Sequence, residues 1–240
     1  MKVTVLSSGS KGNSTLIETS RYNILIDAGL PLSNLEKRLN KPFPEIDILI
    51  ITHSHNDHIK GIKSVIKKYN PLIITKSKEV LELLLDNNKI IENISIDDLS
   101  IELFPLSHDV ECYGVEIKEN KKELVYITDT GYINKKILSI INDKDMYIIE
   151  SNHDITMLRN GPYCEHLKKR VWSDSGHLSN EQTSKYLSAI VGKNTKYIVL
   201  AHLSHENNTE EKALQETTKV IKDKKVLVAK QEEALETIEV

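Results

Sequence analysis

Three histidines and an aspartate follow directly on an apolar run in the first quarter of this chain. Residues 46–52 are apolar and β-branched, which is typical of a strand buried on both faces. The next residues include His53, His55, Asp57 and His58 in the pattern HxHxDH. Imidazole and carboxylate groups are ligands for Zn²⁺, Mn²⁺ and Fe²⁺, and burying them without a partner is costly. The sequence therefore predicts a metal centre at the end of a buried strand.

Three more candidate ligands stand at the ends of later predicted strands. His108 follows the strand predicted at 100–106, and Asp129 follows the strand predicted at 123–128. His202 follows the strand predicted at 196–200. A lone histidine at a strand end is usually structural. Together with HxHxDH, the order and placement of these residues indicate one shared centre.

The predicted elements alternate between short strands and helices. Further strands are predicted at 3–6, 14–18, 22–27, 71–75, 113–118, 146–150 and 225–229. Helices are predicted at 57–69, 77–87, 134–141, 179–191 and 209–222, with an irregular helical segment at 154–171. This pattern favours an α/β class in which helices cover sheets. The chain has 240 residues and no repeat or Pro-rich linker, so we expect a single domain over residues 1–240.

The HxHxDH motif followed by His, Asp and His at strand ends resembles the metallo-β-lactamase superfamily. The resemblance implies a four-layer αβ/βα sandwich, with two mixed β-sheets flanked by helices and the metals at one edge. It also implies two divalent metal ions per chain, Zn²⁺ or Mn²⁺ with Fe²⁺ possible, and a hydroxide shared between them as the nucleophile. The implied ligands are His53, His55 and His108 for one metal and Asp57, His58 and His202 for the other, with Asp129 bridging.

Four local motifs narrow the resemblance to one branch. They are the loop from Leu6 to Ser14, the segment Glu150 to Asp154, the segment Gly176 to Asn180, and the segment Ala201 to Asn208. Together they resemble the WalJ/YycJ (VicX) group of bacterial hydrolases. That resemblance implies a phosphodiesterase with DNA exonuclease activity from a 5′ end, and DNA rather than RNA as partner.

Glu150 and His177 occupy positions similar to a catalytic pair in the tRNA 3′-processing endonucleases. Glu150 ends a predicted strand, and His177 precedes the next predicted helix. The resemblance implies that Glu150 orients His177, which binds the scissile phosphate or protonates the leaving oxygen. Asp57, Glu150 and His177 are accordingly the residues assigned to catalysis.

Small polar residues near the predicted centre are candidates for substrate binding. They are Ser8, Ser10 and Asn13 in an N–H-rich loop, His153, and Ser204, Asn207 and Asn208 after His202. For the loop, a plain turn is an equal alternative. Asp27 is expected to support the histidines from behind. The basic segment 155–176 is either a flap over nucleic acid or a solvated charged face.

Composition limits the remaining possibilities. The chain has 32 Lys and Arg against 35 Asp and Glu, a net charge of −3, which excludes a generally basic coat but allows a local phosphate groove. No signal peptide and no apolar run of roughly 18–20 residues are evident, so we expect a soluble cytoplasmic protein without a membrane partner. The two cysteines, Cys112 and Cys164, are expected to be reduced thiols. Oligomeric state is left open.

Three other functions remain open at this stage. One is a small-molecule phosphodiesterase or a thioesterase similar to glyoxalase II, which would lack the Glu150 and His177 pair. Another is an RNA-processing nuclease. The last is a binding module without activity, which would be expected to lack one or more ligands, whereas every motif position is filled.

Overall fold

Two mixed β-sheets pack face to face in this computed structural model, which describes residues 1–84 and 88–240. The first sheet has the order β14 (Ile238–Glu239), β1 (Lys2–Ser7), β2 (Ser14–Glu18), β3 (Asn23–Ile26), β4 (Ile48–Ile50), β5 (Leu72–Ile74) and β6 (Ile90–Ile91). The second has the order β13 (Lys225–Val228), β12 (Tyr197–Ala201), β11 (Met146–Glu150), β10 (Lys122–Ile127), β9 (Cys112–Glu119), β8 (Leu99–Leu106) and β7 (Ile94–Ile96).

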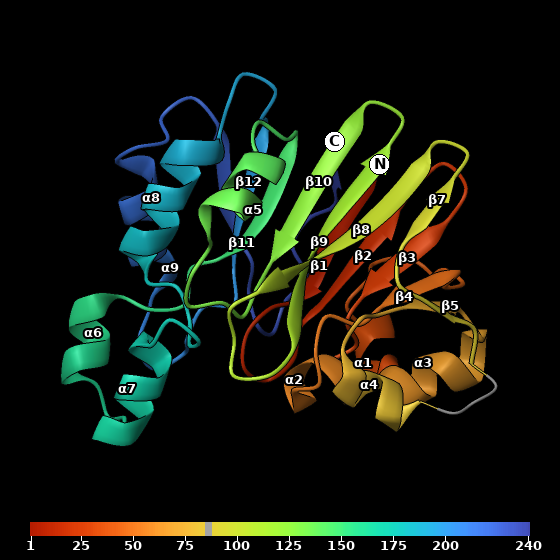
Figure 1. Ribbon diagram of the computed structural model, residues 1–240, viewed down its shortest axis with the longest axis horizontal. Coiled ribbons are helices and arrows are strands. Elements are labelled where there is room, and N and C mark those ends of the chain that lie inside the picture. Colours follow the sequence, from red (N-terminus) through yellow and green to blue (C-terminus); the bar gives the residue numbers. More distant parts are fainter. Residues whose placement is uncertain (85–87) are drawn as a thin grey trace.

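Helices cover the outer face of each sheet (Figure 1). The first sheet packs against α1 (Leu32–Glu36), α3 (Ile62–Tyr69) and α4 (Lys78–Leu83). The second packs against α5 (Lys135–Ile140), α8 (Asn180–Ile190) and α9 (Glu210–Thr218). The predicted four-layer architecture is therefore confirmed. Among the described residues, no helix has both the length and the apolar character needed to cross a membrane.

Strand alternation explains the layers. In β3, Ile24 and Ile26 point into the core between the sheets, whereas Leu25 packs under the helices of the first sheet. In β10, Tyr126 faces the same central core and Val125 faces the helices of the second sheet. Because successive side chains point to opposite faces, strands buried on both sides are apolar throughout.

The helix predicted at 57–69 is wrong as a single element. The structure has α2 (Asn56–Ile59) and α3, interrupted at Gly61. The amide of Gly61 donates to the carbonyl of Ala28 at 2.6 Å, and a Cβ at this glycine would lie 2.0 Å from the carbonyl oxygen of Leu30. The segment 28–30, which packs against Gly61, therefore separates the two helices.

The remaining element predictions differ mainly in their ends. The segment 154–171 forms α6 (Ile155–Asn160) and α7 (Glu165–Trp172), which project beyond the helices that cover the sheets (Figure 1). Ser179 and Gln182 form the predicted capping box of α8. The predicted helix 77–87 is observed as α4, and residues 85–87 lie outside the described residues. α1, β6, β7 and β14 were not predicted.

Candidate metal centre and catalytic site

The predicted ligands converge at one edge of the two sheets. β3 and β4 are parallel neighbours in the first sheet, and β10, β11 and β12 are parallel neighbours in the second. The carboxyl ends of parallel strands meet at the same edge, and the residues that follow them are brought together. The structure thus places side chains far apart in sequence around one point.

Among the described residues, nine side chains form four overlapping groups of potential metal ligands, each with its ligand atoms within 4.8 Å of one another. Two of these groups match the predicted sets: His53, His55 and His108 in one, and Asp57, His58 and His202 in the other. Asp129 lies between the groups. Its Oδ2 is 3.1 Å from Nε2 of His58, and its Oδ1 is 3.3 Å from Nδ1 of His202. This arrangement fits two metal ions that share one carboxylate.

Unpartnered nitrogen atoms support this fit. Within the described part of the chain, Nε2 of His53 and Nε2 of His202 are buried and accept or donate no hydrogen bond. Leaving such an atom unpaired costs about 1–3 kcal/mol, which coordination would offset. Burial, together with the neighbouring His58, holds the pKa of His53 well below its usual value. His53 is therefore neutral, which is the form that binds metal.

Asp27 holds His58 from behind the centre. Its Oδ2 lies 2.7 Å from Nδ1 of His58 and accepts a hydrogen bond from Oγ1 of Thr52 at 2.8 Å. Burial alone would lower the pKa of His58, but Asp129 and Asp27 outweigh it and raise this pKa to about 10. The carboxylates that favour a proton on His58 favour a divalent cation at the same place.

Three strand-end residues of the centre have left-handed backbone. The φ angles are +55° at Asp27, +61° at Asp129 and +53° at His202. A non-glycine residue in this region costs on the order of 1–3 kcal/mol, and such residues cluster at functional sites. The sharp turns let each side chain leave its strand toward the shared centre.

Glu150 contacts two histidines at once. Its Oε1 is 2.6 Å from Nδ1 of His177 and 3.1 Å from Nδ1 of His202. The backbone amide of Thr130 donates to Oε2 at 3.0 Å. Burial would raise the pKa of Glu150, but His177 and His202 outweigh it and lower the pKa to about 2. Glu150 is therefore ionised, and its link to His202 was not predicted.

A cleft of about 190 Å³ opens over these residues. α7 forms one wall through Leu167, Arg170 and Val171, and Ser10 and Ser204 lie among its other lining residues. Asp57, Asp129, His177 and His202 also line it. The predicted flap segment therefore contributes a wall of the cleft. Of the predicted catalytic residues, Asp57 and His177 line the same space, whereas Glu150 is buried behind it.

An ion pair ties α7 to the residue that follows His108, and it was not predicted from the sequence. Nε of Arg170 donates to Oδ2 of Asp109 at 2.8 Å. Oδ1 of Asp109 lies 3.2 Å from Nε2 of His108 and 3.4 Å from Nε2 of His55. Hydrogen bonding to Arg170 and the nearby imidazoles outweigh the effect of burial and lower the pKa of Asp109. Its position directly after His108 was the only available signal.

The predicted substrate-binding residues lie in three different surroundings. Ser10 and Ser204 line the cleft. The side chains that lie elsewhere are Ser8, which accepts from the amide of His202, Asn13, which contacts Asp57 and His58, and the buried Asn207 and Asn208. His153 lines a neighbouring cavity. Asn13 therefore lies directly against two of the proposed ligands, at Oδ2 of Asp57 and Nε2 of His58.

The sequence of this chain matches a known protein family. The family model described as "Beta-lactamase superfamily domain" matches residues 22–203. The chain belongs to the beta-lactamase superfamily. The predicted membership is confirmed, and the matched range includes every candidate metal ligand.

Relatives within the superfamily cover most of the chain. The exodeoxyribonuclease WalJ of Streptococcus pneumoniae is 36% identical over 230 residues, which is 88% of this chain and 85% of WalJ. The exodeoxyribonuclease YycJ of Bacillus anthracis is 34% identical over 234 residues, 92% of this chain and 89% of YycJ. The chain therefore groups with WalJ and YycJ, as predicted.

A solved structure of the superfamily has the same fold. The metallo-β-lactamase fold protein YhfI from Bacillus subtilis superposes with a TM-score of 0.75 and 20% identity, over 98% of this chain and 99% of YhfI. The two mixed sheets flanked by helices are thus the metallo-β-lactamase fold that the sequence predicted.

Proposed function

We propose that this protein is a metal-dependent exodeoxyribonuclease that hydrolyses DNA from a 5′ end. The observation that carries the proposal is the bond between Glu150 and His177 at the edge of a complete ligand set. The names of WalJ and YycJ, both exodeoxyribonucleases, support DNA as the substrate.

Two divalent metal ions, Zn²⁺ or Mn²⁺ with Fe²⁺ as a further candidate, would supply Lewis acidity and lower the pKa of the attacking water. Their proposed holders are His53, His55 and His108 at one position, Asp57, His58 and His202 at the other, and Asp129 between them. Glu150 and His177 also lie within ligand distance of Asp129 and His202. We assign them to acid catalysis because each already satisfies the other.

The protein's own groups then act on the phosphate. Glu150 accepts from Nδ1–H of His177 and stabilises the imidazolium, so the second ring nitrogen carries the proton for the leaving oxygen. Arg170, on the wall of the cleft, presents further donors to the phosphate. α7 covers one side of the cleft and limits the approach of bulk water from there.

The test is a comparison of substrates. The Mn²⁺- or Zn²⁺-loaded protein is incubated with 5′- and 3′-labelled single- and double-stranded DNA, with matched RNA, and with a thioester. We expect mononucleotides to be released from the 5′ end of DNA, and a strand with a blocked 5′ end to be resistant.

Two outcomes would refute the proposal. Thioester cleavage without DNA degradation would point to a glyoxalase II-like hydrolase. Preferential internal cleavage of RNA would point to an RNA-processing nuclease.

A further inference from the structure

A second cavity lies beside the cleft, at the C-terminal end of α7. Its volume is about 290 Å³, near the lower end of ligand pockets, which run from about 300 to 1,000 Å³. Neighbouring residues divide between the two spaces: Val171 lines the cleft and Trp172 the cavity, and Asn152 lines the cleft and His153 the cavity. The cavity and the cleft that holds the proposed catalytic groups are therefore direct neighbours.

Trp172 is the only tryptophan of the chain, and it is 48% exposed. Tryptophan is usually largely buried, so an indole left half-exposed at a cavity is unusual. The guanidinium of Arg159 lies 5.8 Å from the centre of its ring. An exposed indole beside a cation is the combination that binds nucleic-acid bases by stacking.

His153 contributes a polar atom without a partner. The residue is 1% exposed, and its Nδ1 makes no hydrogen bond to any residue that the structure describes. Its backbone carbonyl accepts from the amide of Asn180 at 2.9 Å, which fixes the residue against the start of α8. A buried nitrogen held in this way favours a ligand that supplies its hydrogen bond.

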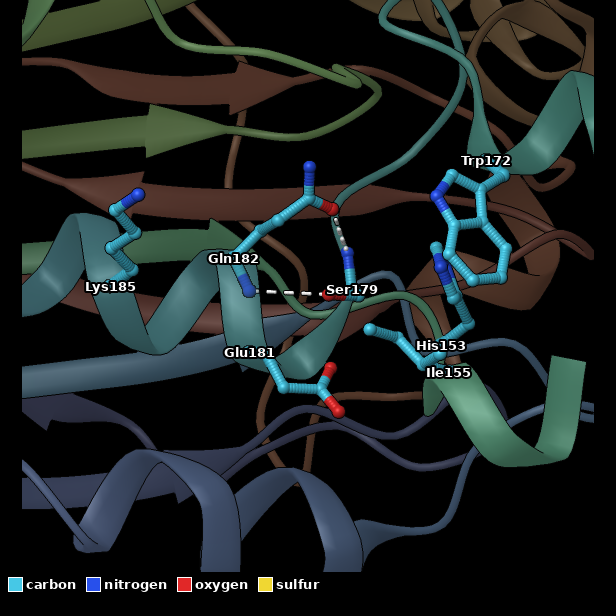
Figure 2. Close-up of a pocket in the computed structure, with 7 residues that line it drawn as sticks. All are labelled: His153, Ile155, Trp172, Ser179, Glu181, Gln182 and Lys185. Carbon is cyan, nitrogen blue, oxygen red and sulfur yellow. Dashed lines mark hydrogen bonds between the residues drawn. The ribbon is translucent and has the colours of Figure 1, made fainter.

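Charged side chains of α8 complete the lining. Figure 2 shows Trp172 and His153 on one side, and Gln182 and Lys185 along α8 on the other. Lys185 is placed to attract a phosphate. The carboxylate of Glu181 can accept from a ring N–H of a base, such as N3–H of thymine, so the lining offers both kinds of partner.

We propose that this cavity binds one base of the DNA strand, next to the phosphate held in the cleft. The base stacks on Trp172, its edge meets the ring nitrogens of His153, and Lys185 contacts the adjoining phosphate. This inference rests on the proposed function and adds a base-binding subsite to it.

The single tryptophan makes the test direct. The metal-loaded protein is titrated with a hydrolysis-resistant phosphorothioate oligothymidylate, and with an abasic oligomer of the same length and backbone. All tryptophan fluorescence comes from Trp172. We expect the oligothymidylate to quench it, and the abasic oligomer to bind more weakly without quenching.

Variants test the same contact independently. Trp172→Ala is expected to weaken oligothymidylate binding about tenfold and to leave abasic binding unchanged, whereas Trp172→Phe retains most of the affinity. His153→Phe is expected to weaken it about fivefold, which corresponds to one hydrogen bond. Val220→Ala, which trims an equally exposed side chain in the turn after α9, is the control and should bind like wild type.

Tight binding without quenching, or unchanged affinity of Trp172→Ala, would overturn the base-binding subsite. If wild type still degrades DNA in that case, the proposed function stands alone. If wild type neither binds nor degrades DNA, the proposed function fails as well.

Discussion

Buried carboxylates decide which nitrogen of each histidine faces the centre. Asp27 contacts Nδ1 of His58, and Glu150 contacts Nδ1 of both His177 and His202. In His177 and His202 this leaves Nε2 as the atom available to a metal or a substrate, and in His58 it leaves Nε2 on the side of Asp129. Such partners fix the orientation of ligands and tune their basicity. The separate roles of these histidines lead to distinguishable predictions.

His177→Ala is expected to retain both metal ions and to lose turnover by about 10²–10⁴-fold, because it removes a proton donor. Metal content per chain and kcat on labelled DNA are measured together. His205→Ala, which changes an exposed histidine outside the centre, should match wild type in both. Loss of metal from His177→Ala would identify His177 as a ligand instead.

Glu150→Gln is expected to act on the metals as well as on turnover. It weakens the support of His202, so metal affinity should fall about 10–100-fold, as is usual for the partner of a ligand. Competition with a chelator measures that affinity. A variant with wild-type metal affinity would show that Glu150 serves His177 alone.

His153 makes a separate prediction about acid stability. Burial lowers the pKa of His153 to about 4, while the unfolded chain keeps the usual value near 6.5. As the pH falls, His153 is therefore protonated in the unfolded state before it is protonated in the folded state. This difference lowers the free energy of unfolding by up to about 3 kcal/mol between about pH 6.5 and 4. In EDTA, His153→Phe should show a flatter fall in unfolding free energy over that window than wild type. Identical slopes would contradict this.

At the scale of the element, α7 forms the wall that encloses the candidate metal centre in a cleft. Its last turn carries Arg170 toward Asp109 and Trp172 toward the neighbouring cavity. The helix ends at Trp172, and the amide of His177 donates to the carbonyl of Val171 at 2.9 Å. His177 and the wall of the cleft are thus fixed to each other.

Arg170→Ala is expected to weaken DNA binding and to reduce the slope of log affinity against log salt by about 0.7–0.9, the value of one phosphate contact. Affinity for a hydrolysis-resistant oligonucleotide is measured over a range of salt concentrations. Arg21→Ala removes an equally charged residue that pairs with Asp97 outside the cleft, and it should leave the slope unchanged. An unchanged slope in Arg170→Ala would exclude a phosphate contact.

At the scale of the whole molecule, the centre joins two sheets. His53 and His55 follow β4 of the first sheet, whereas His108, Asp129 and His202 follow strands of the second. Metal ions bound there would tie the sheets together at one edge. Binding to the folded state alone stabilises it by mass action.

Removal of metal should therefore lower the melting temperature of the whole protein. Chelator treatment followed by stepwise return of Zn²⁺ or Mn²⁺ is followed by calorimetry, with about 2.7 kcal/mol expected at a hundredfold excess over the dissociation constant. Asp129→Ala should show most of this gain lost. A melting temperature that does not change when metal is removed or returned would argue against a metal site between the sheets.

Much of the fold and centre could be predicted because the signals are local. HxHxDH lies within one strand end and one turn, and the later ligands each follow an apolar run. Asp109 and Trp172 could not be predicted, because their surroundings depend on how α7 packs against distant loops. The break at Gly61 likewise depends on residues 28–30. The single domain over residues 1–240 stays a prediction.

The left-handed turns at Asp27, Asp129 and His202 imply a trade-off between the stability of the fold and its ability to bind metal. Glycine adopts that backbone without the penalty that these residues carry, yet it offers no ligand atom. A laboratory selection that rewards survival at high temperature in the absence of metal would therefore find gains at positions that we propose to hold the metal ions or their ligands. Any stabilised version of this enzyme has to be chosen for turnover and heat resistance together.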